Sequence, residues 1–133
     1  MTESTIGKSH VTGEIEAART RISGLRVFHV PDEILTFTTI PPEKVESFPA
    51  VEVHDVREKS VVDGTLDAII AAQPRATTEA AEMRWKLVFT DAAAARVLEV
   101  YVTTPLRQLG LIGTTYVSFS NETLTSWLYT HFV

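Results

Sequence analysis

Four histidines are the side chains of this chain that could act as general bases near neutral pH. His29 and His54 fall in segments rich in β-branched residues, whereas His10 and His131 lie near the two ends of the sequence. No HxH or HxxxH spacing places two imidazole rings on one metal ion, so we predict no metal site. His54 is followed by Asp55, but successive side chains of a strand point to opposite faces and cannot readily bond each other. We therefore keep His29 and His54 as candidate bases and assign no catalytic residue.

Other catalytic and nucleotide-binding patterns are missing from the sequence. Ser118, Ser120 and Ser126 lack the GxSxG context of a serine nucleophile. Gly110 and Gly113 belong to no GxGxxG or GxxxxGK[ST] loop, so no phosphate-binding loop is predicted. We predict no cofactor and favour a protein that is not an enzyme.

The composition narrows the class of protein further. The chain has 133 residues, 44% of them hydrophobic, which is typical of one globular domain. It contains no cysteine, which excludes disulfides and thiolate chemistry. The formal net charge is −5 and the basic residues are scattered along the sequence, which disfavours nucleic acid and anionic membranes as partners. The polar start and the absence of a long apolar run favour a soluble, cytoplasmic protein.

The first half of the chain predicts a tail followed by alternating helices and strands. Residues 1–11 are expected to form a flexible tail, and Thr12 is a candidate cap for a helix that ends near Gly24. The remaining predicted elements are strands over residues 25–30 and 34–40 joined as a hairpin, a short helix over 41–48, and a strand over 51–56.

The second half predicts a helix, three strands and a final amphipathic helix. The predicted ranges are a helix over 60–72, a polar connection over 74–81, and strands over 83–90, 97–103 and 111–120. Asn121 is expected to cap the final helix. Leu124, Trp127, Leu128 and Phe132 recur there at helical spacing and must pack against the sheet.

These elements predict an α+β fold with one domain over residues 12–133. We expect a two-layer sandwich of about six mainly antiparallel strands, with helices packed on one face, because the strands alternate apolar and polar residues. The order of elements resembles profilin-like folds and several bacterial immunity-protein folds. No motif assigns the chain to either group.

Aromatic side chains give the candidate binding residues. Phe28, Tyr101 and Tyr116 are expected to be exposed together on the helix-free face of the sheet, and tyrosine is enriched in protein interfaces. The leading hypothesis is a non-catalytic interaction module, a regulatory or neutralising protein of the immunity type, whose negative charge favours a basic partner. One alternative is a small-molecule site between the sheet and the connections at 74–82 and 103–110, with His29 or His54 as base beside a carboxylate. The other is a homo-oligomeric structural subunit.

Overall fold

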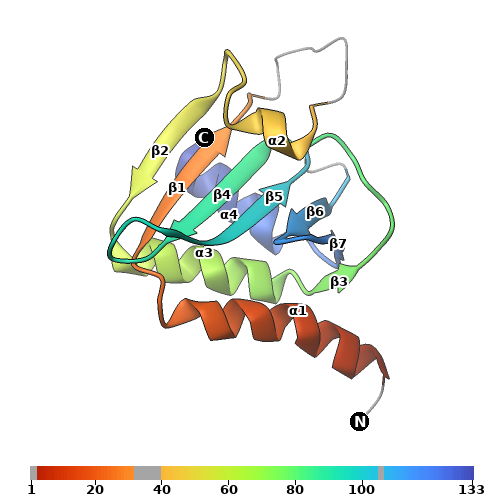
Figure 1. Cartoon of the computed structure of the whole chain (residues 1–133). Coiled ribbons are helices and arrows are strands. Elements are labelled where there is room, and N and C mark those ends of the chain that lie inside the picture. The colour runs from red at the N-terminus through yellow and green to blue at the C-terminus, as the bar shows by residue number, and fades with distance from the viewer. Residues whose placement is uncertain (1–2, 32–39, 105–106) are drawn as a thin grey trace.

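A computed structural model of the chain describes residues 3–31, 40–104 and 107–133, with the side chains of the first range described from residue 11 onward. The helices and strands follow one another along the chain as shown in Figure 1. Their bounds are α1 Glu3–Arg19, β1 Gly24–His29, α2 Pro42–Val45, β2 Glu52–Val56, α3 Lys59–Ala71, β3 Pro74–Ala76, β4 Trp85–Thr90, β5 Arg96–Val102, β6 Leu109–Ile112, β7 Thr115–Phe119 and α4 Thr123–Phe132.

The strands form one antiparallel sheet, as the sequence predicts for an α+β fold. Its order is β2-β1-β4-β5-β6-β7-β3, with seven strands among the described residues where about six were predicted. Residues 34–39 of the predicted hairpin lie outside the described residues. The two edge strands of the described sheet, β2 and β3, differ in length and exposure.

The structure contains two strands that the sequence analysis did not predict, and each has a cause in the local sequence. The segment 111–120 was predicted as one strand but is two, because Gly113 has a φ of 59° and turns the chain between Ile112 and Thr115. A glycine at a position of positive φ between two β-rich segments is typical of a hairpin turn. The connection 74–81 was predicted without secondary structure, but Pro74–Ala76 pairs with β7. Proline is tolerated there because it begins an edge strand.

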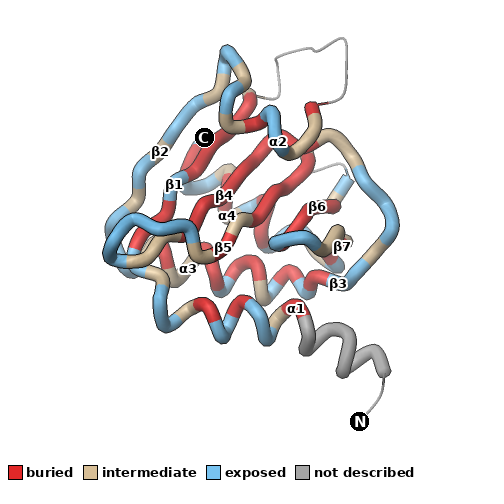
Figure 2. Tube along the Cα trace, in the orientation of Figure 1, coloured by how far each residue is buried: buried red, intermediate tan, exposed pale blue. Residues whose placement is uncertain are grey.

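One face of the sheet, called here the helical face, carries the main core. Strand residues such as Val27, Leu87 and Val100 are fully buried on it. The helical contribution to the same core comes from Val11, Ile15, Val62, Leu66, Ala68, Ile69, Leu124, Leu128 and Phe132 of α1, α3 and α4. Figure 2 shows this burial through the middle strands, in contrast to the exposed β2.

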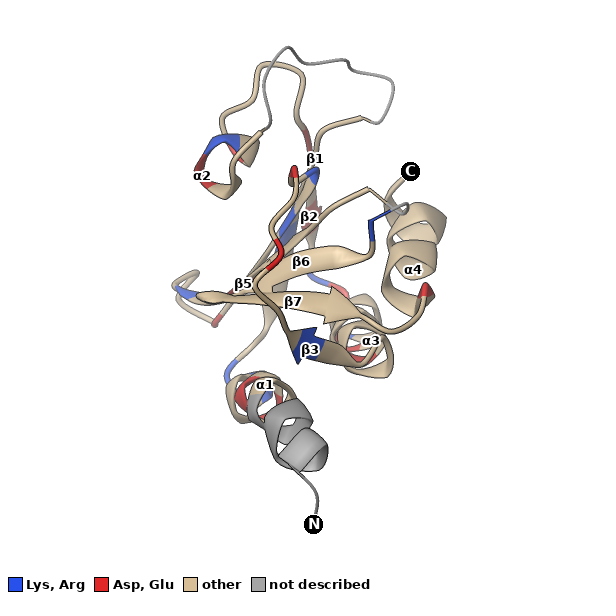
Figure 3. Ribbon diagram, turned by 90° about the vertical axis from the view of Figure 1, so that its right-hand side faces the viewer, with Lys and Arg blue, Asp and Glu red and all other residues tan. Residues whose placement is uncertain are grey.

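The opposite face, called here the second face, is not free of helices as was predicted. Figure 3 shows α2 on the side of the sheet away from α3 and α4. Ile40 and Val45 are buried there in a smaller core with Phe28, Val88 and Tyr101. We call residues 40–51, which include α2, the cover segment.

The N-terminal helix begins earlier than predicted. It runs from Glu3 rather than from Thr12, and Arg19 at its end donates hydrogen bonds to the Asp63 carbonyl oxygen at 3.2 Å and to the Asp67 carboxylate at 2.5 Å. The helix therefore includes residues that the sequence analysis placed in a tail. The flexibility of residues 1–11 stays a prediction.

A glycine lets α3 and α4 approach each other closely. The Trp127 ring of α4 occupies the space where a Cβ atom at Gly64 of α3 would stand. Next to this contact, the Trp127 Nε1–H donates to Thr65 Oγ1 at 2.8 Å. The start of α4 is also tied to α3, because Asn121 accepts a hydrogen bond from Thr123 N and donates to the Ala71 carbonyl. The close packing of Trp127 thus explains why a glycine, Gly64, stands inside the predicted helix.

Gly64→Ala is expected to destabilise the protein. Alanine ordinarily favours a helix over glycine by about 1 kcal/mol, but here its methyl group overlaps Trp127, and overpacking costs about 1–3 kcal/mol. The free energy of unfolding, measured with urea, should fall for Gly64→Ala. It should rise for the control Gly13→Ala, because a Cβ atom at Gly13 of α1 meets nothing within 4 Å. Equal stabilisation by both substitutions would contradict the close contact.

Candidate functional site

The sheet brings the predicted aromatic residues onto one face in one row. In the register of the strands, Phe28 lies opposite Lys86, Lys86 opposite Tyr101, and Tyr101 opposite Leu111. Leu111 in turn lies opposite Tyr116, which completes the row across five strands. The alternation of the sequence therefore placed all three aromatic residues on a common face.

The exposure predicted for this row is wrong. Phe28 is 5% exposed and Tyr101 is 7% exposed, while Tyr116 is half-buried. The cause is the cover segment, which packs Ile40 and Val45 against the row. Phe28, Tyr101 and Tyr116 thus form a covered apolar layer, and a binding role for them stays a prediction.

A charge network around the buried Lys86 ammonium holds the cover segment on the sheet. Lys86 of β4 is 6% exposed. Its Nζ lies 2.8 Å from Glu46 Oε2 of the cover segment and 3.4 Å from Glu99 Oε1 of β5. Arg96 completes the network with its own bonds to Glu46 at 2.6 and 3.1 Å. Tyr101 Oη donates to Glu99 at 3.1 Å.

The beginning of the cover segment is fixed by backbone contacts. Ile40 N donates to Glu82 Oε1 at 3.1 Å, and Met83 N donates to the Ile40 carbonyl at 3.2 Å. Arg84, which is buried, donates to the other Glu82 oxygen at 2.9 Å and to the Pro31 carbonyl at 2.9 Å. Glu82 therefore positions the chain that enters the cover segment.

The network alters the ionisation of its members. Hydrogen bonds from Arg96 outweigh burial and, together with Lys86, lower the pKa of Glu46 to about 2. Burial raises the pKa of the Tyr101 phenol. The Glu46 carboxylate is thus charged throughout the physiological range and can hold the cover segment by ion pairing.

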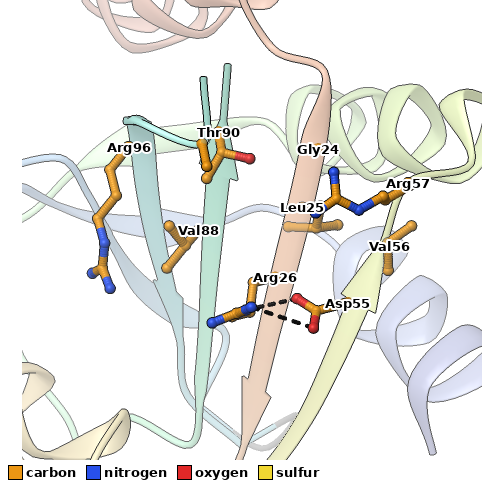
Figure 4. Close-up of a pocket in the computed structure, with 10 residues that line it drawn as sticks. Gly24, Leu25, Arg26, Asp55, Val56, Arg57, Val88, Thr90 and Arg96 are labelled. Atoms are coloured by element: carbon orange, nitrogen blue, oxygen red, sulfur yellow. Dashed lines mark hydrogen bonds and ion pairs between the residues drawn. The ribbon is translucent and has the colours of Figure 1, made fainter. Parts of the chain in front are cut away.

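Beside the cover segment, the second face is open and hollowed. A hollow of about 170 Å³ lies over the end of β2, the start of β1 and the end of β4. Figure 4 shows Arg26, Arg57 and Arg96 around it, with Val88 between Arg26 and Arg96. We call this feature the arginine hollow. It lies on the same face as the covered aromatic row, nearer the end of the sheet where β1 begins.

The three guanidinium groups of the arginine hollow are not equally engaged. Arg26 donates from Nε and Nη2 to the two Asp55 oxygens at 2.6 and 3.3 Å. Arg96 is bound by Glu46 and Glu99. Arg57 is exposed and makes no ion pair within the part of the chain that the structure describes. Its charge does act on Asp55, whose pKa is lowered by the hydrogen bond and charge of Arg26 and further by the charge of Arg57.

The two candidate bases lie on the helical face. His29 is buried and stacks on Trp85 at a centroid distance of 3.7 Å, with its Nδ1 3.9 Å from Glu52 Oε1. His54 is half-buried against the Phe132 ring. Asp55 points to the second face instead, where it binds Arg26, as strand alternation predicts. Neither histidine therefore lies on the face of the sheet that carries the arginine hollow.

The other predicted groups do not converge with these histidines. His131 is exposed and stacks on Trp127, and the side chain of His10 lies outside the described part of the chain. Asp32 and Glu33, the two acidic residues between the predicted strands 25–30 and 34–40, also lie outside it. Among the residues that are described, no group of three or more His, Cys, Asp or Glu side chains could hold a metal ion.

Sequence reasoning missed the arginine hollow and the charge network. Lys86, Glu99 and Arg26 occupy strand positions of the same parity as the aromatic row, so their common face was readable from alternation. Their pairing was not, because the Lys86–Glu99 pair requires β4 beside β5 and the Arg26–Asp55 pair requires β1 beside β2. The signal in the sequence was that charged residues occupy alternate positions of several strands, on the face of the sheet opposite the main core.

Comparisons with known proteins identify no relative of this chain. Family models, curated proteins and solved structures all give no match to the chain. The fold itself is α+β with an antiparallel sheet. Over the described residues, no helix has the length and apolar character needed to cross a bilayer.

The Glu46 contact predicts a pH dependence of stability. In the folded protein the pKa of Glu46, about 2, lies below the ordinary glutamate value of 4.5. The ion pairing therefore stabilises the fold above about pH 4.5, and this stabilisation is lost as the pH falls toward 2. Because the side chain is 33% exposed, solvent screening reduces this contribution to about 1–2 kcal/mol.

Glu46→Gln should remove that contribution and with it this part of the pH dependence. Urea unfolding at pH 7 should show a loss of about 1–2 kcal/mol, and the difference from the wild type should shrink toward pH 3. The control Glu43→Gln changes an exposed carboxylate of the same segment and should have little effect. A loss that is equal at both pH values would argue against the ion pairing.

Proposed function

We propose that this protein is a non-catalytic protein-interaction module. It binds a partner protein along strand β2 and thereby regulates or neutralises it. The observation that carries this proposal is the exposure of β2 at the edge of the sheet. Within the described chain β2 pairs with β1 alone, and its Val53 side chain is 49% exposed. An edge strand presents unpaired backbone groups that can accept a strand from another protein.

The other edge of the sheet is a poorer candidate for strand addition. β3 has three residues and begins with Pro74, which has no backbone N–H to donate. β2 has five residues and no proline. The available edge is therefore the one next to the arginine hollow.

The side chains of β2 favour a selective partner. Glu52 and Asp55 are exposed charges on this strand, and charged edge residues are a common means of suppressing indiscriminate pairing. Val53, which lies between them, gives an incoming strand an apolar contact. A strand of complementary pattern would be accepted, whereas an apolar strand would leave the charges desolvated.

The alternatives remain secondary because the observations favour them less. A small-molecule site was expected near residues 74–82 and 103–110 with His29 or His54 as base, but the arginine hollow lies at the opposite end of β4 and β5. A homo-oligomeric subunit would use the same β2 edge with a second copy. Light scattering of the purified chain separates this case from a monomer that binds another protein.

Val53→Lys should abolish partner binding without unfolding the protein. Surface substitutions usually change stability by less than about 0.5 kcal/mol, and the added charge would have to be buried by an incoming strand. Quantitative capture from native lysate should recover a partner with the wild type and lose it at least about tenfold with Val53→Lys.

The matched control is Thr114→Lys, which adds the same charge in the exposed turn between β6 and β7. This variant should retain the partner. If the wild type and both variants recover the same proteins in the same amounts, the β2 edge is not the binding surface. If nothing is enriched and the protein is a monodisperse monomer, the interaction proposal fails as a whole.

A further inference from the structure

We propose that the arginine hollow binds the phosphate group of a small molecule, with Arg57 and Thr90 as the donors on its two sides. This site goes beyond the proposed function, because it lies over β1 and does not use the outer edge of β2. It is drawn from the row across three strands in which Arg57, Gly24 and Thr90 lie side by side.

The strand register places Gly24 between two larger side chains. Gly24 of β1 lies opposite Thr90 of β4, and Leu25 lies opposite Val56 of β2. Continuing the second pairing by one residue brings Arg57 beside Gly24, and both line the hollow. Figure 4 shows the Thr90 hydroxyl pointing toward Gly24 from one side, and the Arg57 side chain reaching over β1 from the other.

The missing side chain of Gly24 gives the hollow its depth. A Cβ atom at this position would stand 2.9 Å from Thr90 Oγ1, so close that one of the two atoms would have to shift. Val88 and Ala94 add apolar lining beside the polar groups. The volume of about 170 Å³ is below the range of about 300–1,000 Å³ that is typical of drug-sized ligands. The hollow therefore suits one small polar group.

The two groups beside Gly24 have hydrogen-bonding capacity to spare. Within the residues that the structure describes, neither the Arg57 guanidinium nor the Thr90 hydroxyl makes a hydrogen bond. A guanidinium carries five N–H donors and a threonine hydroxyl carries one. Both side chains can therefore donate to a ligand without losing a bond within the described chain.

The balance of charges favours an anion at this place. Arg26 is balanced by Asp55, to which it donates at 2.6 Å. Arg96 and Lys86 are balanced by the two glutamates of the charge network. Arg57 acts electrostatically on Asp55 but has no carboxylate of its own among the described residues. One positive charge is thus left over in the described part of the hollow, on the side chain that reaches over Gly24.

A phosphate group fits these donors better than a carboxylate does. A guanidinium donates two parallel hydrogen bonds to two oxygens of either group. Both oxygens of a carboxylate are then used by Arg57, whereas a phosphate has a further oxygen that accepts a bond from Thr90. The threonine on the far side of Gly24 therefore selects the tetrahedral anion over the planar one.

Anion titrations followed by NMR test this inference on the full chain at constant ionic strength. The probes are inorganic phosphate and glycerol phosphate, with acetate and chloride for comparison. Phosphate should shift the amide resonances of residues 24–26, 57 and 90 to saturation, and should bind about fivefold more tightly than acetate because of the added Thr90 bond. Tighter binding of glycerol phosphate would identify the ligand as a phosphate ester, and equal binding would identify it as phosphate itself.

Two variants assign the binding to the named donors. Arg57→Gln should weaken phosphate binding by at least about tenfold, because it removes a charged bidentate donor. Thr90→Val should weaken phosphate binding about fivefold and leave acetate binding unchanged. The matched control is Arg75→Gln, which removes an exposed arginine of the distant edge strand β3 and should bind phosphate as the wild type does.

Two results would overturn the site. Equal shifts with phosphate, acetate and chloride would indicate an adventitious ion only. Phosphate binding that survives Arg57→Gln unchanged would remove the proposed donor. Val53→Lys should leave the phosphate shifts in place, because Val53 is not among the residues that line the hollow. Failure of this site and failure of the β2 interface are therefore measured separately.

Discussion

The Glu46 carboxylate, held between Lys86 and Arg96, is the contact on which the layout of the second face depends. It joins a short segment with little regular structure to two central strands, at 2.8 Å from Lys86 and 2.6 Å from Arg96. Burying the Lys86 ammonium is tolerated because Glu46 and Glu99 compensate it, and an uncompensated buried charge would be costly. The same contact keeps the cover segment closed over Phe28 and Tyr101.

This closure divides the second face into two parts with different roles. The covered part is an apolar layer that stabilises the sheet, in addition to the larger core on the helical face. The open part retains charged side chains, the arginine hollow and the exposed edge strand β2. Recognition is therefore expected at the open part, where a strand added to β2 would meet the exposed Val53 side chain without displacing any described element.

The local pattern of the sequence was sufficient for most elements and insufficient for the site. Alternation placed Glu99 and Tyr101 on one face of β5 because burial with a period of two is a property of the strand itself. The short helix of the cover segment was predicted, but its packing on the second face was not, because Ile40 and Val45 contact strands that are distant in sequence. The proximity of Arg57 to β1 likewise follows from strand order, which no local pattern contains.

Solvent accessibility measured by NMR with a soluble gadolinium chelate tests the division of the second face most directly. The account predicts that the ring resonances of Phe28 and Tyr101 are protected from paramagnetic broadening, while the guanidinium resonances of Arg26 and Arg57 are strongly broadened. Broadening of the Phe28 and Tyr101 rings to the same extent as the two arginines would contradict it, because the cover segment would then not be closed.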